Sequence, residues 1–476
     1  MQPSAFNLRV PLPTGDVFLM NTLTDAQLVV SSDAARLVEQ TGDAGAATGA
    51  AACEDELEAL ATLAEHGFLV PDAASEQAAL ALRFSEFRED TSQLRITVLT
   101  TMQCNFACDY CYQGDRADAS GPAPTMSLET SAQVAEWIAN RLDAVRPGRL
   151  VLTFFGGEPL LNTAAMFDLA ERCWQATQAR GVKQLVNIIT NGLLLSPAIV
   201  DRMLPLGLNG VKVTLDGDRA THDRVRPARG GQGTFDRIIA NLRRVADKTP
   251  VAIGGNFDAT TADRYPALLD FLKDQDFAGR ISKIAFKPVI QPKSGQAPAG
   301  LIPLTAVGPD RQPLGASCMS VAGSGSAGAS TCDSCHFADE QMATLREETK
   351  RRGFSTPDGL HMGPCELYRR HSHTIGPDGS LYACPGFTGD NALAVGHIVA
   401  GQDGLRPGVA SRFERLAPWR QCGDCSFIPV CGGGCAVASH AELGDMEAPS
   451  CHKQAFESAL YSLAEEAAGT ISGGLQ

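Results

Sequence analysis

Six short apolar segments alternate with helical patterns between residues 94 and 290, and this alternation constrains the fold more than any other feature. The strand-like segments cover 94–100, 149–155, 184–190, 210–215, 251–257 and 283–289. Helical periodicity fills the intervals, for example over 128–142 and 234–247. Strands that alternate with helices in this way form a parallel sheet with right-handed crossovers. The sequence therefore predicts an α/β fold, and an open sheet or a partly closed barrel fits the pattern equally well.

The regions on either side of this alternation differ from it. Before it, strand-like segments at 17–22, 27–30 and 68–70 and helical patterns at 32–40 and 53–66 suggest a winged-helix-like module, with a Gly/Ala-rich loop at 42–52. After it, Gly, Ser and Ala dominate 321–330, which is typical of a flexible linker. The end of the chain is rich in cysteine and closes with a helical pattern at 453–467. We expect four parts, covering 1–90, 91–300, 301–363 (a linker or loop) and 364–476.

Composition and charge exclude several classes of function. The chain has 476 residues and a formal net charge of -14, which argues against nonspecific binding to nucleic acid or to anionic membranes. No segment approaches the roughly 18 uninterrupted apolar residues of a membrane span. The N-terminal sequence MQPSAFNLRV lacks the pattern of a signal peptide. The sequence therefore predicts a cytoplasmic protein without nucleic-acid or membrane partners.

The placement of the fifteen cysteines predicts metal binding rather than a disulfide framework, which suits small secreted domains. Directly after the first strand, Cys104, Cys108 and Cys111 are spaced C-x3-C-x2-C. Three thiolates can hold three irons of a [4Fe-4S] cluster and leave the fourth iron open to an exogenous ligand. A structural zinc site is the alternative, but zinc sites usually close with four ligands and no fourth Cys or His stands nearby.

Polar motifs follow the next three strands. They are GGEP at 156–159, TNG at 190–192, and TLDG at 214–217 followed by HDRVRP at 222–227. The carboxyl ends of parallel strands lie at one edge, where α/β folds place their active sites. Glycines there let backbone groups approach a ligand closely, and Glu158 could anchor an ammonium group.

In combination, these motifs resemble the radical S-adenosylmethionine (radical SAM) superfamily over about residues 94–290. The resemblance implies a partial (β/α)6 TIM-like barrel in which the amino and carboxylate groups of SAM chelate the open iron. It also implies that Tyr110 lies near the adenine and that Gly157 and Glu158 meet the methionine amino group. The other expected cofactor-binding residues are Gly156, Asn191, Thr214, Asp216 and Arg226. Thr214 and Asp216 could instead cap strand ends, and Gly156 could simply shape the turn.

The C-terminal cysteines resemble the seven-cysteine SPASM domain, which accompanies many radical SAM peptide-modifying enzymes. The matching positions, with Gly379, are Cys365, Cys384, Cys422, Cys425, Cys431, Cys435 and Cys451. The resemblance implies two auxiliary [4Fe-4S] clusters, one on Cys422, Cys425, Cys431 and Cys451 and the other on Cys365, Cys384, Cys435 and an upstream cysteine. A zinc ribbon is the alternative, although seven ligands divide badly into tetrahedral sites.

The fourth ligand of the second auxiliary set stays open at this point. Cys318, Cys332 or Cys335 could supply it, or one iron could receive a substrate thiolate. Cys332 and Cys335 could also form a separate redox or metal pair. We expect Cys53 and Cys173 to be apolar fillers, and His371 and His373 to pack or to face solvent.

The leading functional hypothesis is a radical SAM peptide maturase. It cleaves SAM reductively to a 5'-deoxyadenosyl radical and oxidatively modifies a ribosomally synthesised peptide by thioether or other cross-link formation. The N-terminal module resembles elements that bind a leader peptide as an added strand, so the expected partners are a precursor peptide and a low-potential electron donor such as flavodoxin or ferredoxin.

Two other functions remain in view. One is a sulfatase-type maturase that generates formylglycine. Those relatives have an Asp where Pro385 stands, although Asp378 or Asp390 could substitute. The other is a non-catalytic iron–sulfur electron-transfer or scaffold protein, against which the intact GGEP and TLDG motifs argue.

Overall fold

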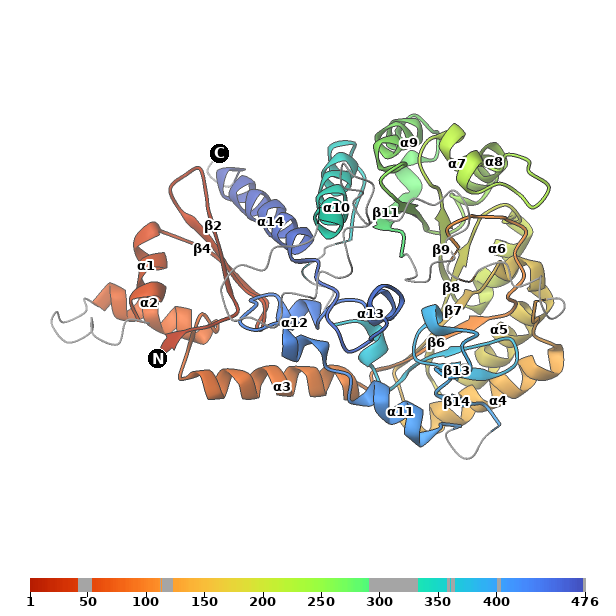
Figure 1. Cartoon of the computed structure of the whole chain (residues 1–476), viewed down its shortest axis with the longest axis horizontal. Coiled ribbons are helices and arrows are strands. Elements are labelled where there is room, and N and C mark those ends of the chain that lie inside the picture. The colour runs from red at the N-terminus through yellow and green to blue at the C-terminus, as the bar shows by residue number, and fades with distance from the viewer. Residues whose placement is uncertain are drawn as a thin grey trace, which may run out of the picture.

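A parallel sheet with helices on its outer face forms the larger body of the molecule, on the right in Figure 1. The computed structural model describes residues 1–41, 54–111, 113, 123–290, 333–357, 360, 364–399 and 404–473. The parallel strands are β6 (Gln93–Leu99), β7 (Arg149–Phe155), β8 (Lys183–Thr190), β9 (Leu208–Thr214), β10 (Val251–Phe257) and β11 (Ile281–Pro288). Each pairs in parallel with the next along the chain. The predicted α/β fold and its six strands are confirmed.

Helices cover one face of these strands and bury alternate side chains. They are α4 (Leu128–Val145), α5 (Thr163–Gln178), α6 (Pro197–Met203), α7 (Arg219–Val225), α8 (Phe235–Val245) and α9 (Tyr265–Lys273). Ile96, Leu152 and Val213 are fully buried against this layer. Because successive strand residues point to opposite faces, residues such as Thr97 and Lys212 line the other surface of the sheet. We call this surface the inner face.

Three further strands extend the same sheet beyond β6. They are β12 (Ser372–Ile375), β13 (Ser380–Tyr382) and β14 (Gly396–His397), and they complete a nine-stranded sheet. Strand β12 runs parallel to β6, with Thr374 opposite Thr97. The sequence did not predict these strands. They make the cysteine-rich part of the chain continuous with the central sheet.

The N-terminal residues form a three-stranded antiparallel sheet with two helices. Its strands are β2 (Asn7–Pro11), β3 (Val17–Asn21) and β4 (Ala26–Val30). Its helices are α1 (Ser32–Gln40) and α2 (Glu54–Glu65). A separate pair of short strands, β1 (Gln2–Pro3) and β5 (Leu69–Val70), runs antiparallel. The predicted strands and helices are confirmed, while β1 and β2 were missed. The predicted loop at 42–52 and Cys53 lie outside the described residues. A long helix, α3 (Ala73–Glu89), leads from this unit to β6.

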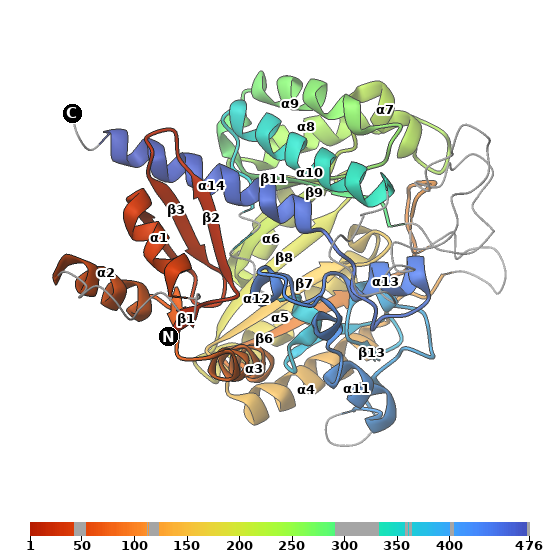
Figure 2. The same ribbon diagram turned by 60° about the vertical axis from the view of Figure 1, so that its left-hand side comes forward.

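The N-terminal sheet shares its core with the C-terminal end of the chain. Helix α14 (Lys453–Gly473) lies beside β2 (Figure 2). Phe18 and Met20 on one face of the sheet are buried with Phe427 and Leu460. On the opposite face, other strand residues pack against α1 and α2. The two ends of the chain therefore stabilise each other.

The prediction of a linker or loop over 301–363 is wrong for part of that range. Residues Asp333–Arg351 form the helix α10, which packs against α14, α9 and β11. Leu345 is buried in the main core, and the guanidinium of Arg352 forms a bidentate ion pair with Asp270 at 2.6 and 2.8 Å. Cys318 and Cys332 lie outside the described residues, as does the side chain of Cys335.

The remaining helices are short and belong to the cysteine-rich region. They are α11 (Pro407–Glu414), α12 (Ile428–Cys431) and α13 (Ala436–Leu443). Among the helices that the structure describes, none combines the length and the apolar character that crossing a membrane requires.

Candidate functional site

The loop that carries Cys104, Cys108 and Cys111 follows β6 and is held from one side by the segment after α7. The backbone N–H of Ala107 donates to the carbonyl oxygen of Pro227 at 2.9 Å. The Nε of Arg229 donates to the carbonyl of Cys104 at 2.7 Å, and the Arg229 amide donates to Asn105 at 3.0 Å. The loop is therefore fixed before any ligand arrives. Sequence reasoning missed this role of Arg229.

The three thiols of this loop lie close enough together for the charge of one to raise the pKa of another. Burial raises the pKa of Cys104, and the charges of Glu158 and Cys111 raise it further. Burial also raises the pKa of Cys108 to about 12, with Cys104 and Cys111 adding to the rise. A metal ligand must be a thiolate, so a cation that binds here would release protons and relieve this mutual repulsion. The donor set fits a cationic iron–sulfur cluster.

The glycines of the GGEP motif pack directly against the backbone that leads into Cys104. Gly156 has a φ of +138°, and a Cβ there would lie 2.4 Å from the carbonyl oxygen of Thr101. A Cβ on Gly157 would lie 2.1 Å from the carbonyl oxygen of Gln103. Neither contact is possible for any other residue without moving the chain. The glycines thus set the position of the cysteine loop, whether or not they also touch a ligand.

Glu158 links the second and third strand ends. Its carboxylate is fully buried and accepts hydrogen bonds from the hydroxyl of Thr190 at 2.7 Å and the amide of Asn191 at 2.8 Å. Burial raises its pKa, and these hydrogen bonds oppose the rise. Asn191 in turn donates to the side chain of Asn105 at 2.7 Å, beside Cys104. The GGEP, TNG and cysteine motifs therefore form one connected unit.

Tyr110, Asp216 and Arg226 form a buried network at the same edge of the sheet. The hydroxyl of Tyr110 donates to Asp216 and accepts from Arg226, whose Nη1 lies 3.5 Å from the carboxylate. Burial raises the pKa of Asp216, although the Arg226 charge opposes this. Asn256 completes the network by donating its backbone N–H to Asp216 at 2.7 Å. The structure thus brings together three residues that the sequence singled out.

Two features of this network bear on ligand binding. The Nε of Arg226 is buried and has no hydrogen-bond partner among the described residues, so it can donate to a ligand. Thr214 lies half-buried on the inner face at the end of β9. Asn256 and Tyr265, which contact Asp216, were missed because they lie on β10 and α9, and only the fold brings these elements to Asp216.

Replacing Asp216 by Asn should lower the free energy of unfolding by about 3 kcal/mol, because removal of one partner leaves the buried Arg226 cation uncompensated. Denaturant unfolding of the cluster-free protein measures this. The matched control is Asp201→Asn, which breaks the exposed pair with Lys248 and should cost less than about 1 kcal/mol. Equal losses in the two variants would contradict this account.

The seven C-terminal cysteines fall into two groups by the charges that act on them. Burial raises the pKa of Cys384 to about 12, and the charges of Cys365 and Cys435 add to it. Burial likewise raises the pKa of Cys431 to about 12, with contributions from Cys422, Cys451 and Cys425. In both cases the charges come from cysteines of the same expected cluster set. Roles as cluster ligands remain predictions.

Tyr368 lies between the two C-terminal groups. Its hydroxyl donates to the carbonyl of Gly432 at 3.1 Å, and its pKa is raised by burial and by Cys365, Cys431 and Cys435. Its ring meets that of Trp419 edge-on at 5.4 Å, and Trp419 stacks on Phe84 of α3.

Within the described residues, no group of three or more His, Cys, Asp or Glu side chains closes around a single metal ion.

Comparison with known proteins bears on the central sheet and its cysteine loop. Residues 98–262 match the model of the radical SAM superfamily. This part of the chain is a radical SAM domain. Fe-coproporphyrin III synthase of Methanosarcina barkeri (strain Fusaro / DSM 804) is 27% identical over 208 residues, which are 41% of this chain and 48% of that protein. PqqA peptide cyclase of Xanthomonas euvesicatoria pv. vesicatoria (strain 85-10) is 27% identical over 177 residues, or 37% and 43% of the two chains. The chain thus matches less than half the length of either relative.

A solved structure extends the likeness beyond the radical SAM domain. Native anSMEcpe with bound AdoMet and Cp18Cys peptide has a TM-score of 0.55 and 15% sequence identity, over 81% of this chain and all (100%) of that one. At this identity the comparison shows a shared fold. The match covers more of the chain than the radical SAM domain alone.

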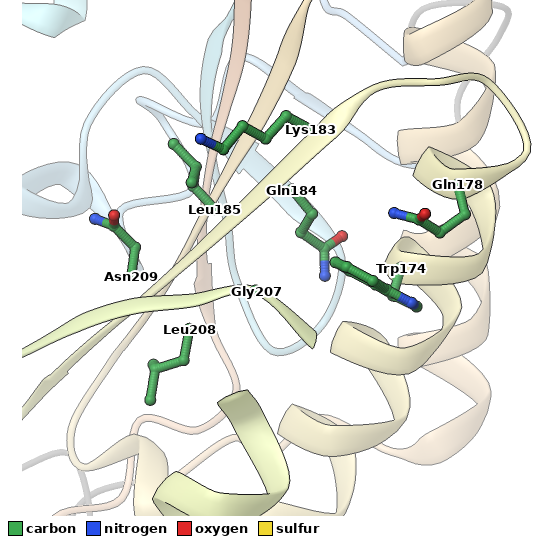
Figure 3. A pocket seen from close by; sticks show the side chains of 8 residues that line it. All are labelled: Trp174, Gln178, Lys183, Gln184, Leu185, Gly207, Leu208 and Asn209. Carbon is green, nitrogen blue, oxygen red and sulfur yellow. The ribbon is translucent and has the colours of Figure 1, made fainter. Parts of the chain in front are cut away.

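A shallow pocket of about 320 Å³ lies at the other end of the radical SAM domain's strands. It is lined by the first residues of β8 and β9 together with α5. Figure 3 shows Gln184 extending from β8 toward Trp174 of α5. The amide of Gln184 already donates to the carbonyls of Ala170 and Leu206. The amino end of such strands usually serves stability, and no cysteine lines the pocket.

The remaining side chains considered in the sequence have packing roles. Cys173 is fully buried in α5. His373 is buried with its ring edge-on to Trp137 at 5.4 Å. The Nδ1 of His371 lies 3.4 Å from the guanidinium of Arg141. The expectations for these three residues are confirmed.

Proposed function

We propose that this protein cleaves SAM reductively and uses the resulting radical to modify a ribosomally synthesised peptide. The observation that carries the proposal is the group of three thiols at the carboxyl edge of a radical SAM domain. Three thiolates hold a [4Fe-4S] cluster with one iron open, and that opening distinguishes a SAM site from a purely structural centre. The chain's own residues then bind and orient what enters.

When bound, the cluster supplies a low-potential electron to SAM, which yields methionine and a 5'-deoxyadenosyl radical that takes a hydrogen atom from the substrate. Cys104, Cys108 and Cys111 hold the cluster. Gly156, Gly157, Glu158 and Asn191 position this loop, while Tyr110, Thr214, Asp216 and Arg226 face the cosubstrate. The unpartnered Nε of Arg226 supports this assignment, because a carboxylate or ribose oxygen would satisfy it.

The two C-terminal cysteine groups would hold auxiliary [4Fe-4S] clusters, which would supply an acceptor for the electron left after hydrogen removal. Cys422, Cys425, Cys431 and Cys451 make a complete set of four. Cys365, Cys384 and Cys435 make a set of three, to which Cys318, Cys332, Cys335 or a substrate thiolate adds the fourth ligand. An external donor such as flavodoxin or ferredoxin would supply the first electron to the cluster on Cys104, Cys108 and Cys111.

A peptide substrate is favoured by the character of similar proteins and by the N-terminal sheet. PqqA peptide cyclase is named for a peptide, and anSMEcpe was solved with one. Strands β2 and β4 form the edges of the N-terminal sheet, and such edges can accept a leader peptide as an added strand. Loss of two hydrogens during cross-linking fits an enzyme with auxiliary electron acceptors.

Formylglycine formation is less well supported. Both oxygens of Asp378 hydrogen-bond to Ser380 within the turn before β13, at 3.0 and 2.8 Å. Asp390 accepts from the amide of Ala392 in its own loop. Each carboxylate is used to form a turn, and Pro385 stands beside Cys384 where sulfatase-type relatives have an Asp. A base for that reaction is therefore not provided at these positions.

The test is anaerobic turnover with SAM, dithionite and the peptide encoded by a short reading frame beside this gene. We expect 5'-deoxyadenosine, and a peptide lighter by two hydrogens with a new cross-link in its fragment spectrum. A peptide cysteine converted to an aldehyde would favour the sulfatase-type reaction instead. Absence of 5'-deoxyadenosine from cluster-replete protein would refute catalysis and favour the scaffold.

The division of the C-terminal cysteines can be tested by iron content. Replacing Cys422 and Cys451 together by alanine removes ligands from one group and should lower bound iron by about four atoms per chain. Replacing Cys422 and Cys435 together removes ligands from both groups and should lower it by about eight. Cys173→Ala is the control and should retain all iron. Equal losses in the two double variants would contradict the division.

A further inference from the structure

Lys212 and Lys287 are two of three lysines, with Lys283, that lie on the inner face of the sheet and have no role in the chemistry above. Lys212 lies in the middle of β9, and Lys287 lies near the end of β11. Lys212 is half-buried, and its ammonium forms no hydrogen bond or ion pair with any described residue. By contrast, Lys248, Lys350 and Lys453 each pair with a carboxylate. An unpaired cation inside an enzyme with a net charge of -14 calls for an explanation.

The side chain of Lys212 extends toward the carboxyl edge of the sheet. Lys212 pairs with Ala252 of β10, whereas its end lies against Gly254, two residues nearer that edge. A Cβ on Gly254 would lie 2.5 Å from the Cε of Lys212. The missing side chain at Gly254 therefore gives the lysine its path. Its ammonium lies at the level of Thr214, which is opposite Gly254.

Lys287 connects this position to the C-terminal cysteines. Burial of Lys212 lowers its pKa to about 8, and the charge of Lys287 contributes a smaller part of this decrease. The same charge lowers the pKa values of Cys365 and Cys384 against the larger effect of burial. Lys287 therefore lies close enough to act on both sides. The strand register places Lys287 on the same face as Gly254 and two residues nearer the carboxyl edge of the sheet.

Among the described residues, the inner-face neighbours of the two lysines provide no free anion. The inner-face neighbours of the two lysines on β9 and β10 are Thr214, Gly254 and Asn256. Asp216 lies beyond β9, but its oxygens are buried and occupied by Asn256, Tyr110 and Arg226. Arg95, on the inner face of β6, is already paired with Glu366 at 3.0 Å. Two neighbouring cations without a counter-charge are the arrangement that binds an incoming anion.

We propose that Lys212 and Lys287 form a binding site for a carboxylate of the substrate peptide on the inner face of the sheet, near its carboxyl edge. This inference rests on the proposed function and names a chemical requirement of the substrate: an Asp or Glu side chain, or a terminal carboxylate, close to the modified residue. Binding brings the anion between two cations and relieves their repulsion. It also fixes the peptide at a second point, away from the leader segment.

The test uses the cluster-replete protein without reductant, so that no turnover is needed. Trace acetylation followed by mass spectrometry reports the reactivity of each lysine. The probes are Ac-Gly-Ala-Glu-Ala-Gly-NH2, its Gln twin, and the Gln twin with a free terminal carboxylate, each at millimolar concentration. We expect a carboxylate probe to protect Lys212 about tenfold better than the amidated Gln twin, with Lys248 unchanged.

Two variants assign the effect to the pair. Lys287→Met should remove most of the protection at Lys212. Lys273→Met, at the end of α9 in the outer helix layer, is the control and should retain it. The proposal would be overturned if neither carboxylate probe protected Lys212 better than the amidated Gln twin, or if protection were unchanged in Lys287→Met. Protection by the free terminal carboxylate alone would support the site and identify its source as a peptide terminus.

A further experiment repeats the probe measurements in the presence of SAM. If SAM abolishes the difference between the Glu and Gln probes, the pair recognises the cosubstrate's carboxylate, and the proposal is wrong. If 5'-deoxyadenosine forms normally but no probe discriminates, this inference fails while the proposed function stands. If no 5'-deoxyadenosine forms, the proposed function fails irrespective of the lysine result.

Discussion

Protein in which Cys108 is replaced by alanine should release no measurable 5'-deoxyadenosine, a loss of at least about a thousandfold from a catalysed rate. Cys108 is the middle thiol of the group after β6, and its pKa is raised by burial and by both of its partners. Two remaining thiolates leave two irons unheld, so the cluster is lost or altered. The measurement is nucleoside release by liquid chromatography, with iron content and the electron paramagnetic resonance spectrum of the reduced protein.

Cys173→Ala is the matched control for this experiment. Cys173 is also buried, and burial raises its pKa to about 12, but it lies in α5 among apolar side chains. Its replacement should leave nucleoside release unchanged and cost about 1 kcal/mol of stability. Retained turnover in Cys108→Ala, or lost turnover in Cys173→Ala, would disprove the assignment of the cluster site.

Gly157→Ala should lower the rate of nucleoside release by about a hundredfold without removing any metal ligand. The new Cβ would meet the carbonyl oxygens of Gln103 and Met102, at 2.1 and 2.7 Å. Relief requires the backbone just before Cys104 to move, and a displacement of about 1 Å near a reacting centre costs roughly that factor. Single-turnover kinetics with reduced protein measures the effect.

Gly279→Ala controls for the change of residue type, because a Cβ at that position meets nothing within 4 Å. This variant should be as active as the parent. The iron of the two C-terminal cysteine groups should be retained in both variants, which separates local displacement from general misfolding. A fully active Gly157→Ala protein would show that the cysteine loop is not positioned by the GGEP motif.

The central strands were predictable because they are continuous apolar runs bounded by turn residues. Strand β7, for instance, begins and ends at the predicted residues. By contrast, Ser372–Ile375 is short and mixed in polarity, and becomes strand β12 only because β6 offers it a partner. Helix α10 is polar and follows a low-complexity segment, so its packing against α14 decides its structure. The missed helix α3 could have been found from its run of strong helix formers.

The site divides in the same way. Each motif could be recognised because its own residues are close together in sequence. In the structure, the cysteine loop and the strand-end motifs lie at one edge of the sheet. Asn256, Tyr265 and Arg229 contact those residues from other strands and loops, so their contribution depends on register and on the path of the chain. The lysine pair is of this kind too, because no motif contains both residues.

The backbone ladder between β6 and β12 has a consequence for electron flow. Cys104 follows one of these strands, Cys365 precedes the other and Cys384 lies just past the hairpin partner of β12, so hydrogen-bonded main chain joins the first cysteine loop to two cysteines of the C-terminal set. The separation between these cysteines is thus set by the sheet. Under the proposed function, the reach of the peptide across that separation determines which of its atoms are oxidised.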